Sequence, residues 1–519
     1  MTKPRLVHPT HILIAVVLAM FVSGGSAYSL YYADLMEGGL VAFFACALSA
    51  LIVCLFFTHM RVALSLVLIL ASGPIGLYLY QRTGVALTKL LDEVVFVMFG
   101  GSVLVSAILT RRRLYLDHGA ALVILALWGA ISSVINAVPT DIAFVGGVLV
   151  LKPIMVFLVY QNALVGLGRY REFIFAQIRT LLEATPVLSL LYVILFELVG
   201  GHNWLPGFSL PERLGLTPSR SFFTHPGVLG SVMAVMSVYH FATFLTTARK
   251  RSCVLFGCAL LGVALSLRVK SLLLLPLVLC LVLFVFYTIR KPRRYDQILL
   301  FLLFLCLICS IIVILAFIFQ NELDFYFAPD SSAVRTILLK TALLINQETL
   351  GLGKGFGTYG SSVSVSYHYS DLYYKYGIAY LHGATPYNYA YITDQWWAWF
   401  LGEIGIVGTL IFLTWMSSLA LDLYRVAKHS YTCNKELSGL ALSSLGILTY
   451  GIASGYADAN LTTPPTGYLI MGIAGIVMAF SKRIYERESG CWTNYANSML
   501  LDFGLTSGIE REGLRQFQK

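Results

Sequence analysis

Two cations stand in an otherwise apolar stretch of the chain, LSLRVKSLLLLPL (265–277). Arg268 and Lys270 separate two apolar runs and have Ser266 and Ser271 beside them. Long basic side chains at the end of a membrane span can reach lipid phosphates, whereas basic side chains inside the membrane line a functional cavity. Both arrangements require an anion, and the sequence leaves open whether a lipid or a substrate supplies it.

Other cations and a candidate base occur in segments that could reach the same anion. Arg220 lies in SRSFFTHPGVLG (219–230), and Arg335 lies in the first turn of a predicted helix. Guanidinium groups bind phosphate oxygens in pairs and stay charged at physiological pH, so a diphosphate fits this set. Cations around a diphosphate leaving group stabilise its developing charge without a metal. The chain has no DxD motif, and its one ExD, Glu322 with Asp324, is weak evidence for a metal site.

Transfer to an acceptor hydroxyl also needs a base or a hydrogen-bond acceptor within reach. Asp394 is the preferred candidate, because it stands where a long polar segment meets the apolar run TDQWWAWFLGEIGIVG. The same position suits the N-cap of a helix, and the two roles are compatible. His225, His382 and His368 are further candidates.

Composition identifies the elements that must position these residues. The chain has 519 residues, of which 58% are hydrophobic and 12% charged, and a mean hydropathy of +0.78. A helix needs about 20 apolar residues to span a bilayer, which predicts an all-α membrane protein with about fourteen spans. The candidate spans are 12–32, 38–58, 62–80, 92–110, 118–138, 142–164, 174–199, 226–247, 252–267, 271–289, 297–319, 395–420, 437–456 and 464–480.

The distribution of Lys and Arg predicts the orientation of these spans. Most basic residues follow even-numbered spans, and such loops are cytoplasmic by the positive-inside rule. Both termini are then cytoplasmic, and the net charge of +10 reflects topology, not a nucleic-acid partner. The nine cysteines all fall in spans or cytoplasmic loops, so no outer disulfide is expected. We divide the chain into N-terminal helices (1–170), a catalytic core (171–481) and a cytoplasmic tail (482–519).

Two long outer segments, about 200–225 and 320–394, are the expected places for function. In the second, Ser332 can cap an amphipathic surface helix. GLGKGFGTYG (351–360) follows; it lacks a preceding strand and the Walker spacing, which favours a flexible turn with close backbone approach over phosphate binding. The remaining residues are rich in tyrosine and end at Trp396. Aromatic residues gather at membrane interfaces, but they also suit sugar rings, and both interpretations remain open.

In order along the chain, these segments resemble the O-antigen polymerase and ligase superfamily of bacterial polysaccharide assembly. In that family one arginine lies near the outer end of a helix pair, a second precedes an lxGxGxGxf segment, and Asp-Asn or His-Asn precedes yLxxlxExGiiG. Arg268, Arg335, 351–357, Asp394 and 403–408 match these positions in order. The resemblance begins at about residue 219. Two residues depart from the pattern: Leu267 replaces the usual serine, and Gln395 replaces the asparagine, which leaves the acceptor chemistry open.

The resemblance implies a metal-independent membrane glycosyltransferase without a cofactor, whose donor substrate is an undecaprenyl-diphosphate-linked oligosaccharide. Arg268, Arg335 and Asp394 would be catalytic, and Arg220 and Lys270 would help the two arginines bind the diphosphate. The tyrosine-rich segment would hold the glycan, with four glycan-binding or accessory residues: His225, His382, Tyr359 and Trp396.

The family divides into polymerases, which join lipid-linked repeat units, and ligases, which transfer a finished glycan to a lipid or protein acceptor. Ligases tend to carry histidine at the position of Asp394, which favours a polymerase. The expected location is the bacterial inner membrane with the site facing the periplasm or cell exterior, and the expected partners are membrane lipids, a chain-length regulator and a flippase. A flippase of lipid-linked sugars is the alternative from another class.

Overall fold

The computed structural model describes residues 59–83, 90–164, 170–199, 215–290 and 333–487, together with a few isolated positions. In this part of the chain the regular structure is helical, and no β-strand is formed. Eight of the described helices are long and apolar enough to cross a membrane. The protein is therefore an α-helical membrane protein.

The described helices coincide with apolar runs predicted from the sequence. Three predicted spans, 12–32, 38–58 and 297–319, lie outside the continuous described ranges, whereas each of the other eleven corresponds to a helix. In chain order the helices of the bundle are α3 (Arg61–Thr83), α4 (Leu91–Leu109), α5 (Gly119–Ile135), α6 (Thr140–Asn162), α7 (Arg171–Tyr192) with its π-helical extension η3 (Val193–Val199), α8 (Pro226–Thr247), α9 (Lys250–Leu265), α10 (Val269–Arg290), α15 (Trp396–Cys433), α16 (Lys435–Ser454) and α17 (Thr466–Arg487).

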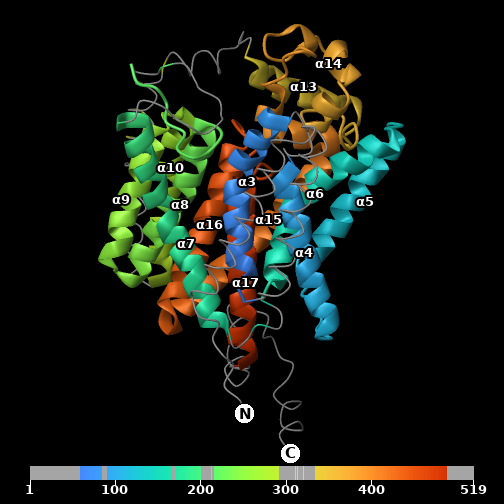
Figure 1. The fold of residues 1–519 in the computed structure, drawn as a ribbon. Coiled ribbons are helices and arrows are strands. Elements are labelled where there is room, and N and C mark those ends of the chain that lie inside the picture. Colours follow the sequence, from blue (N-terminus) through green and yellow to red (C-terminus); the bar gives the residue numbers. More distant parts are fainter. Residues whose placement is uncertain are drawn as a thin grey trace, which may run out of the picture.

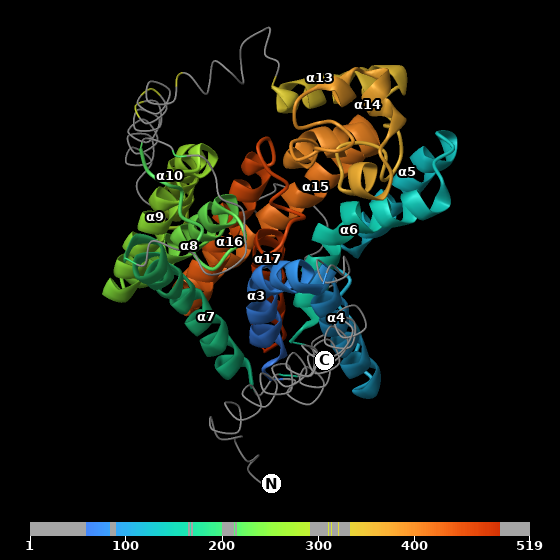
Figure 2. The same ribbon diagram turned by 45° about the horizontal axis from the view of Figure 1, so that its top comes forward.

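The helices form a bundle with three regions, which the two ribbon views show together (Figures 1 and 2). Helices α8, α9 and α10 lie on one side, α4, α5 and α6 lie on the other, and α15, α16 and α17 stand between them. Helix α6 packs against α17, and α5 packs against α15. One hydrophobic core therefore includes helices from both sides of residue 170.

Helices α8 and α16 are largely buried, and small residues allow close approach among the helices around them. A Cβ on Gly446 would lie 2.5 Å from Val282 and 2.7 Å from Val238, and a Cβ on Gly262 would lie 2.8 Å from Met233. Lipid tails are as apolar as the helices, so packing of this kind, not exclusion from water, holds membrane helices together.

A compact cap covers one end of the bundle, at the top of Figure 1. It comprises residues 333–395 and contains α13 (Val334–Glu348), η4 (Val363–Tyr367), α14 (Asp371–Lys375), η5 (Ile378–Tyr380) and η6 (Ile392–Asp394). The cap has a hydrophobic cluster of its own, beneath α13. The predicted helix is confirmed, although Ala333 is its N-cap residue and Ser332 lies outside the described ranges. What the sequence presents as a long tyrosine-rich loop is thus largely a folded unit.

Helix α15 differs most from its predicted span, 395–420. It continues to Cys433 and is broken at Gly405, which has φ +68° and ψ −175°. The break leaves four consecutive carbonyls without regular helical partners, and each accepts another hydrogen bond. Two of these carbonyls accept from side chains: Leu401 O from Asn346 Nδ2 (2.7 Å) and Ile404 O from Trp128 Nε1 (2.9 Å). The other two, Gly402 O and Glu403 O, accept from the backbone N–H groups of Lys354 and Gly355, each at 2.8 Å. Non-helical backbone at membrane depth is tolerated where protein groups satisfy it in this way.

Candidate functional site

Helix α8 begins at a histidine that the sequence marks as a candidate. Pro226 occupies the first helical position, where its missing N–H costs nothing. His225 is the N-cap residue, and its Nδ1 accepts a hydrogen bond from the Gly227 N–H at 3.0 Å. Burial, followed by the charge of Arg268, lowers the pKa of His225 to about 4, with Asp394 opposing the shift. His225 is therefore neutral near pH 7 and acts here as a cap.

Arg268 stands at the reversal between α9 and α10. Leu267 has φ +49°, and the Arg268 carbonyl accepts the first N–H bonds of α10, from Ser271 at 3.0 Å and Leu272 at 3.1 Å. A Cβ on Gly227 would lie 3.4 Å from a terminal nitrogen of Arg268. The guanidinium thus lies against the first turn of α8, within van der Waals reach of Gly227.

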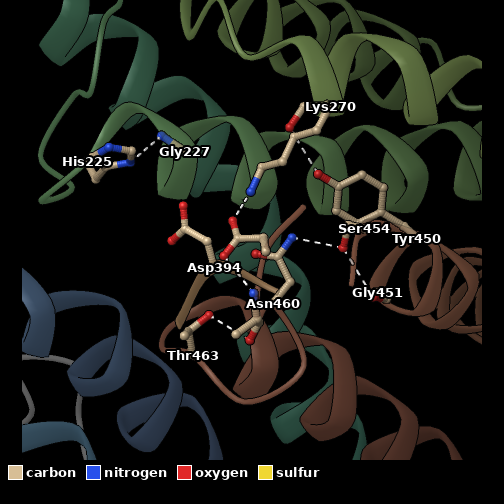
Figure 3. Close-up of polar contacts among 12 residues, drawn as sticks. His225, Gly227, Lys270, Asp394, Tyr450, Gly451, Ser454, Asn460 and Thr463 are labelled. Atoms are coloured by element: carbon tan, nitrogen blue, oxygen red, sulfur yellow. Dashed lines mark hydrogen bonds and ion pairs between the residues drawn. The ribbon is translucent and has the colours of Figure 1, made fainter. Parts of the chain in front are cut away.

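Lys270 lies in the first turn of α10 and is almost completely buried. Its side chain is 9% exposed, and its ammonium forms an ion pair with Asp458 in the connection between α16 and α17. Figure 3 shows this ammonium close to the carboxylate of Asp394. Just below, Ser271 and Tyr450 share a hydrogen bond of 3.1 Å, which joins α10 to α16.

Arg335 and Asp394 form a second ion pair. The guanidinium Nη2 donates to Asp394 Oδ2 at 2.6 Å, with side-chain exposures of 17% and 36%. Asp394 does not cap α15: the N-cap residue is Gln395, which makes no capping hydrogen bond, and Gly455 O accepts the Trp396 N–H at 2.9 Å. The N-cap role considered for Asp394 is wrong, and its carboxylate is committed to Arg335.

The two ion pairs and His225 belong to one site. The charges of Arg268, Lys270 and Asp394 all act on His225, and Arg335 acts on Lys270. In Figure 3, Asp394 lies between His225 and Lys270. Four segments that are far apart in the sequence therefore meet at the end of the bundle that carries the cap.

Four helices also begin at this site. Helix α8 starts directly after His225, α10 directly after Arg268, α13 directly before Arg335, and α15 two residues after Asp394. The N-terminus of a helix carries a partial positive charge, which favours an anion even where, as at Gly227 and Trp396, an N–H is already bonded within the protein. The helix starts and the three cations therefore act in the same direction, toward binding a multiply charged anion.

Arg220 is placed beside a different partner. Its backbone N–H donates to Glu197 Oε1 at 3.3 Å, and Ser219 N donates to Leu265 O at 2.9 Å, which ties this segment to the end of α9. Burial lowers the pKa of Arg220, and Glu197 opposes that shift. Arg220 is thus near the α9–α10 reversal, while the contacts described for it lead to Glu197.

Two of the residues assigned to glycan contact are fully buried. Tyr359 donates its hydroxyl to Leu338 O at 2.8 Å and packs under the cap, and Trp396 packs against Phe400 and Phe412. Neither presents a surface to a ligand in this structure, so both are structural here. His382, by contrast, is exposed and makes an edge contact with Tyr391.

The tyrosines of the cap divide into two groups. Tyr359 and Tyr373 are completely buried. Burial raises the pKa of the Tyr373 hydroxyl, which therefore stays protonated. Others are well exposed. The exposed set is Tyr367, Tyr374, Tyr380, Tyr387 and Tyr391. An exposed aromatic face with a polar tip is the property that contact with a sugar requires.

The glycine-rich segment is a packing element. Gly351, Gly353, Gly355, Gly357 and Gly360 all have positive φ, a conformation that glycine adopts without strain. A Cβ added to Gly353, Gly355 or Gly357 would come within 2.5–2.7 Å of the backbone of α15, α5 or α6, respectively. Close backbone approach, as predicted, explains the glycines.

The N–H groups of this segment are also occupied. Gly353 N donates to Thr349 Oγ1 at 3.1 Å, and Phe356 N donates to Ser133 Oγ at 3.0 Å, in addition to the bonds of Lys354 and Gly355 to α15. A phosphate-binding loop needs such groups free to face its ligand. The segment therefore joins α5, α13 and α15 and does not cradle a phosphate.

Sequence reasoning did not pair Lys270 with Asp458, or Lys152 of α6 with the acidic residues of α4. Lys152 of α6 contacts Glu93 at 2.8 Å and Asp92 at 3.4 Å, both at the start of α4. A search of the sequence for acidic residues that could neutralise each buried lysine would find the partners of both lysines.

Two further observations complete the site. Within the described ranges, no group of three or more His, Cys, Asp or Glu residues could hold a metal ion, and Glu322 and Asp324 lie outside those ranges. In comparisons with known proteins, no family model matches the chain and no curated protein is significantly similar. The argument for function therefore depends on the site itself.

Proposed function

We propose that this protein is a membrane glycosyltransferase related to the O-antigen polymerases and ligases, and that it joins lipid-linked repeat units into a surface polysaccharide. One observation supports this most: Arg268, Lys270 and Arg335 converge with Asp394 where four helices begin. Such a site suits a diphosphate that carries at least two charges.

The proposed reaction assigns each group a task. An acceptor hydroxyl attacks the anomeric carbon of the donor sugar, and the bond from that carbon to the diphosphate oxygen breaks. The diphosphate leaves with the bonding electrons, and Arg268 and Arg335 stabilise its charge. Asp394, which is partly exposed, takes the proton of the acceptor when the phosphate displaces it from Arg335.

The proposed orientation places the site outside the cytoplasm. Arg249 directly precedes α9, and Lys250 and Arg251 lie in its first turn, while Arg425 and Lys428 lie near the end of α15. Each group is therefore at the far end of a helix whose other end reaches the site. The positive-inside rule assigns those far ends to the cytoplasm. We accordingly propose fourteen spans, a location in a bacterial inner membrane, and a donor with an undecaprenyl-diphosphate anchor.

The exposed tyrosines of the cap are the proposed contact for the growing glycan. Tyr367, Tyr374, Tyr380, Tyr387 and Tyr391 replace the earlier choice of Tyr359 and Trp396, because only exposed rings can stack on sugars. His382 contacts Tyr391 and belongs to the same surface.

A flippase of lipid-linked sugars is the second candidate, and one observation favours it. Lys152 of α6 and Asp92 of α4 form a buried ion pair within the helical bundle, with the partly exposed Glu93 beside it. Charged groups inside the membrane often mark transport pathways. A polymerase needs no such pathway.

The size distribution of cell-surface polysaccharide tests the proposal. Arg268→Ala and Arg335→Ala should reach the membrane in normal amount and abolish polymerisation, so that single lipid-linked repeat units accumulate on the outer leaflet. Arg→Lys should restore activity only in part, because a lysine cannot bind two phosphate oxygens as a guanidinium does. Lys375→Ala is the matched control: Lys375 is an exposed cation of the cap, paired with Glu348, and its loss should change nothing.

Other outcomes point elsewhere. Complete lipid-linked chains that never reach an acceptor would indicate a ligase, and repeat units retained on the cytoplasmic side would indicate a flippase. Normal polysaccharide in both alanine variants would refute the assignment of the site.

A further inference from the structure

The cations of the site are held by carboxylates from two different elements. Asp394 precedes α15 and pairs with Arg335, whereas Asp458 lies between α16 and α17 and pairs with Lys270. The proposed reaction uses Asp394 as a base but gives Asp458 no task. A second carboxylate facing an anion site is unexpected, because it competes with the anion.

The α16–α17 connection holds Asp458 firmly in this place. Asp458 Oδ1 accepts the Ala459 N–H at 2.8 Å, while Oδ2 faces Lys270. The buried side chain of Asn460, which follows Asp458, donates to Oγ of Ser454, which precedes it, at 2.9 Å. Gly455 O accepts the first N–H of α15, which fixes the connection next to Asp394. Figure 3 shows Asn460 and Ser454 beneath Lys270.

The charges define what the site can accept. Three cations face two carboxylates here, and His225 is neutral, so one net positive charge remains. Membrane surfaces also contain anionic phosphodiester lipids such as phosphatidylglycerol, whose headgroups carry one net negative charge. Without its carboxylates, a site with three cations at the membrane surface would bind those headgroups strongly.

We propose that Asp458 is a specificity-determining residue that keeps anionic lipids with one net negative charge out of the site. It occupies Lys270 until a diphosphate, with its larger charge and several oxygens, displaces it. A monoanionic headgroup cannot compete equally with a carboxylate that is already in place. Selection here works by disfavouring the abundant wrong ligand, which is a recognised route to specificity. This inference rests on the proposed diphosphate site.

Binding of geranylgeranyl diphosphate to the full chain in lipid nanodiscs tests the inference. Its Kd is measured in nanodiscs of phosphatidylcholine alone and of phosphatidylcholine with phosphatidylglycerol. The wild type should change little between the two. Asp458→Asn, which keeps the acceptor for Ala459 N–H, should bind about tenfold more weakly when phosphatidylglycerol is present, because the headgroup now occupies Lys270.

Two variants control the experiment. Glu348→Gln removes the acid of an exposed acid–lysine pair in the cap and should behave as the wild type, which accounts for repulsion by the anionic surface. In Lys270→Gln the additional substitution Asp458→Asn should have no further effect on lipid competition, since Asp458 acts through Lys270.

The outcomes separate this inference from the proposed function. An equal Kd in both nanodiscs for Asp458→Asn would overturn the inference while leaving the diphosphate site intact. Loss of binding in both would also overturn it, because Asp458 would then only position Lys270. A wild type that binds no diphosphate, even in phosphatidylcholine alone, would refute the diphosphate site itself.

Discussion

Asn346 is the side chain on which the break in α15 depends most. It is buried in α13, where its Nδ2 donates to Leu401 O at 2.7 Å and its Oδ1 accepts the Ile406 N–H at 2.7 Å. These two backbone groups flank Gly405 and have no regular helical partner. Asn346→Ala leaves both unsatisfied, and each buried orphan costs about 1–3 kcal/mol. The expected loss of stability is therefore about 2–6 kcal/mol, toward the lower value if water enters the vacated space.

Thermal unfolding of the purified protein in detergent measures this loss. Asn346→Ala should lower the Tm by several degrees, whereas Asn388→Ala should leave it unchanged. Asn388 is an exposed asparagine of the same cap, and its described hydrogen bonds are made by its backbone. An Asn346→Ala protein that unfolds with the wild type would show that the glycine-rich segment alone supports the break, and that the reasoning about orphaned groups is wrong.

Three further predictions follow from the same contacts. Gly405→Ala should destabilise the protein by about 1–2 kcal/mol because of the positive φ alone, and by more because the new Cβ would overlap the facing backbone. Gly257→Ala, in open space on α9, should not destabilise it, and the Tm of each variant tests this expectation. Phe356→Ala should lower the Tm strongly, since deleting a buried phenyl ring costs about 3–5 kcal/mol; an unchanged Tm would contradict the burial of that ring between α5 and α6. The stabilising effect of His225 should be complete above pH 6.5, its ordinary pKa, and decline as pH falls toward 4, by about 3 kcal/mol at most; a Tm series against His225→Asn, which keeps an acceptor but does not titrate, should show a steeper acid decline only for wild type.

Helix positions could be predicted well from the sequence because membrane spans depend on local composition. A run of apolar residues must satisfy its own backbone in lipid, which makes it a helix whatever its neighbours are. Pro226 also marked the start of α8 correctly, because the rule behind it is local. The convergence of Arg268, Arg335 and Asp394 agrees with their predicted location at one end of the bundle.

Features that depend on distant contacts could not be predicted. The break at Gly405 needs Asn346 and the glycine-rich segment to replace lost hydrogen bonds, and nothing within the run GEIGIVG distinguishes it from a continuous helix. Burial of Tyr359 and Trp396 likewise results from the folding of the cap, whereas composition alone presents all its aromatic residues as equivalent. The pairing of Lys270 with Asp458 joins the first turn of α10 to the α16–α17 connection, which no sequence spacing relates.

The shortness of α9 has a consequence for the surrounding lipid. With 16 residues it is about 24 Å long, less than the hydrocarbon thickness of about 30 Å. Val254 and Leu261 are exposed on its surface. In the proposed topology α9 crosses the membrane, and the bilayer would have to adapt to this helix. Such hydrophobic mismatch is met by local thinning of the bilayer. In that topology the headgroup layer beside α9 would be drawn inward toward Arg268, and the proposed isoprenoid-anchored donor could present its phosphates to the site without leaving the membrane.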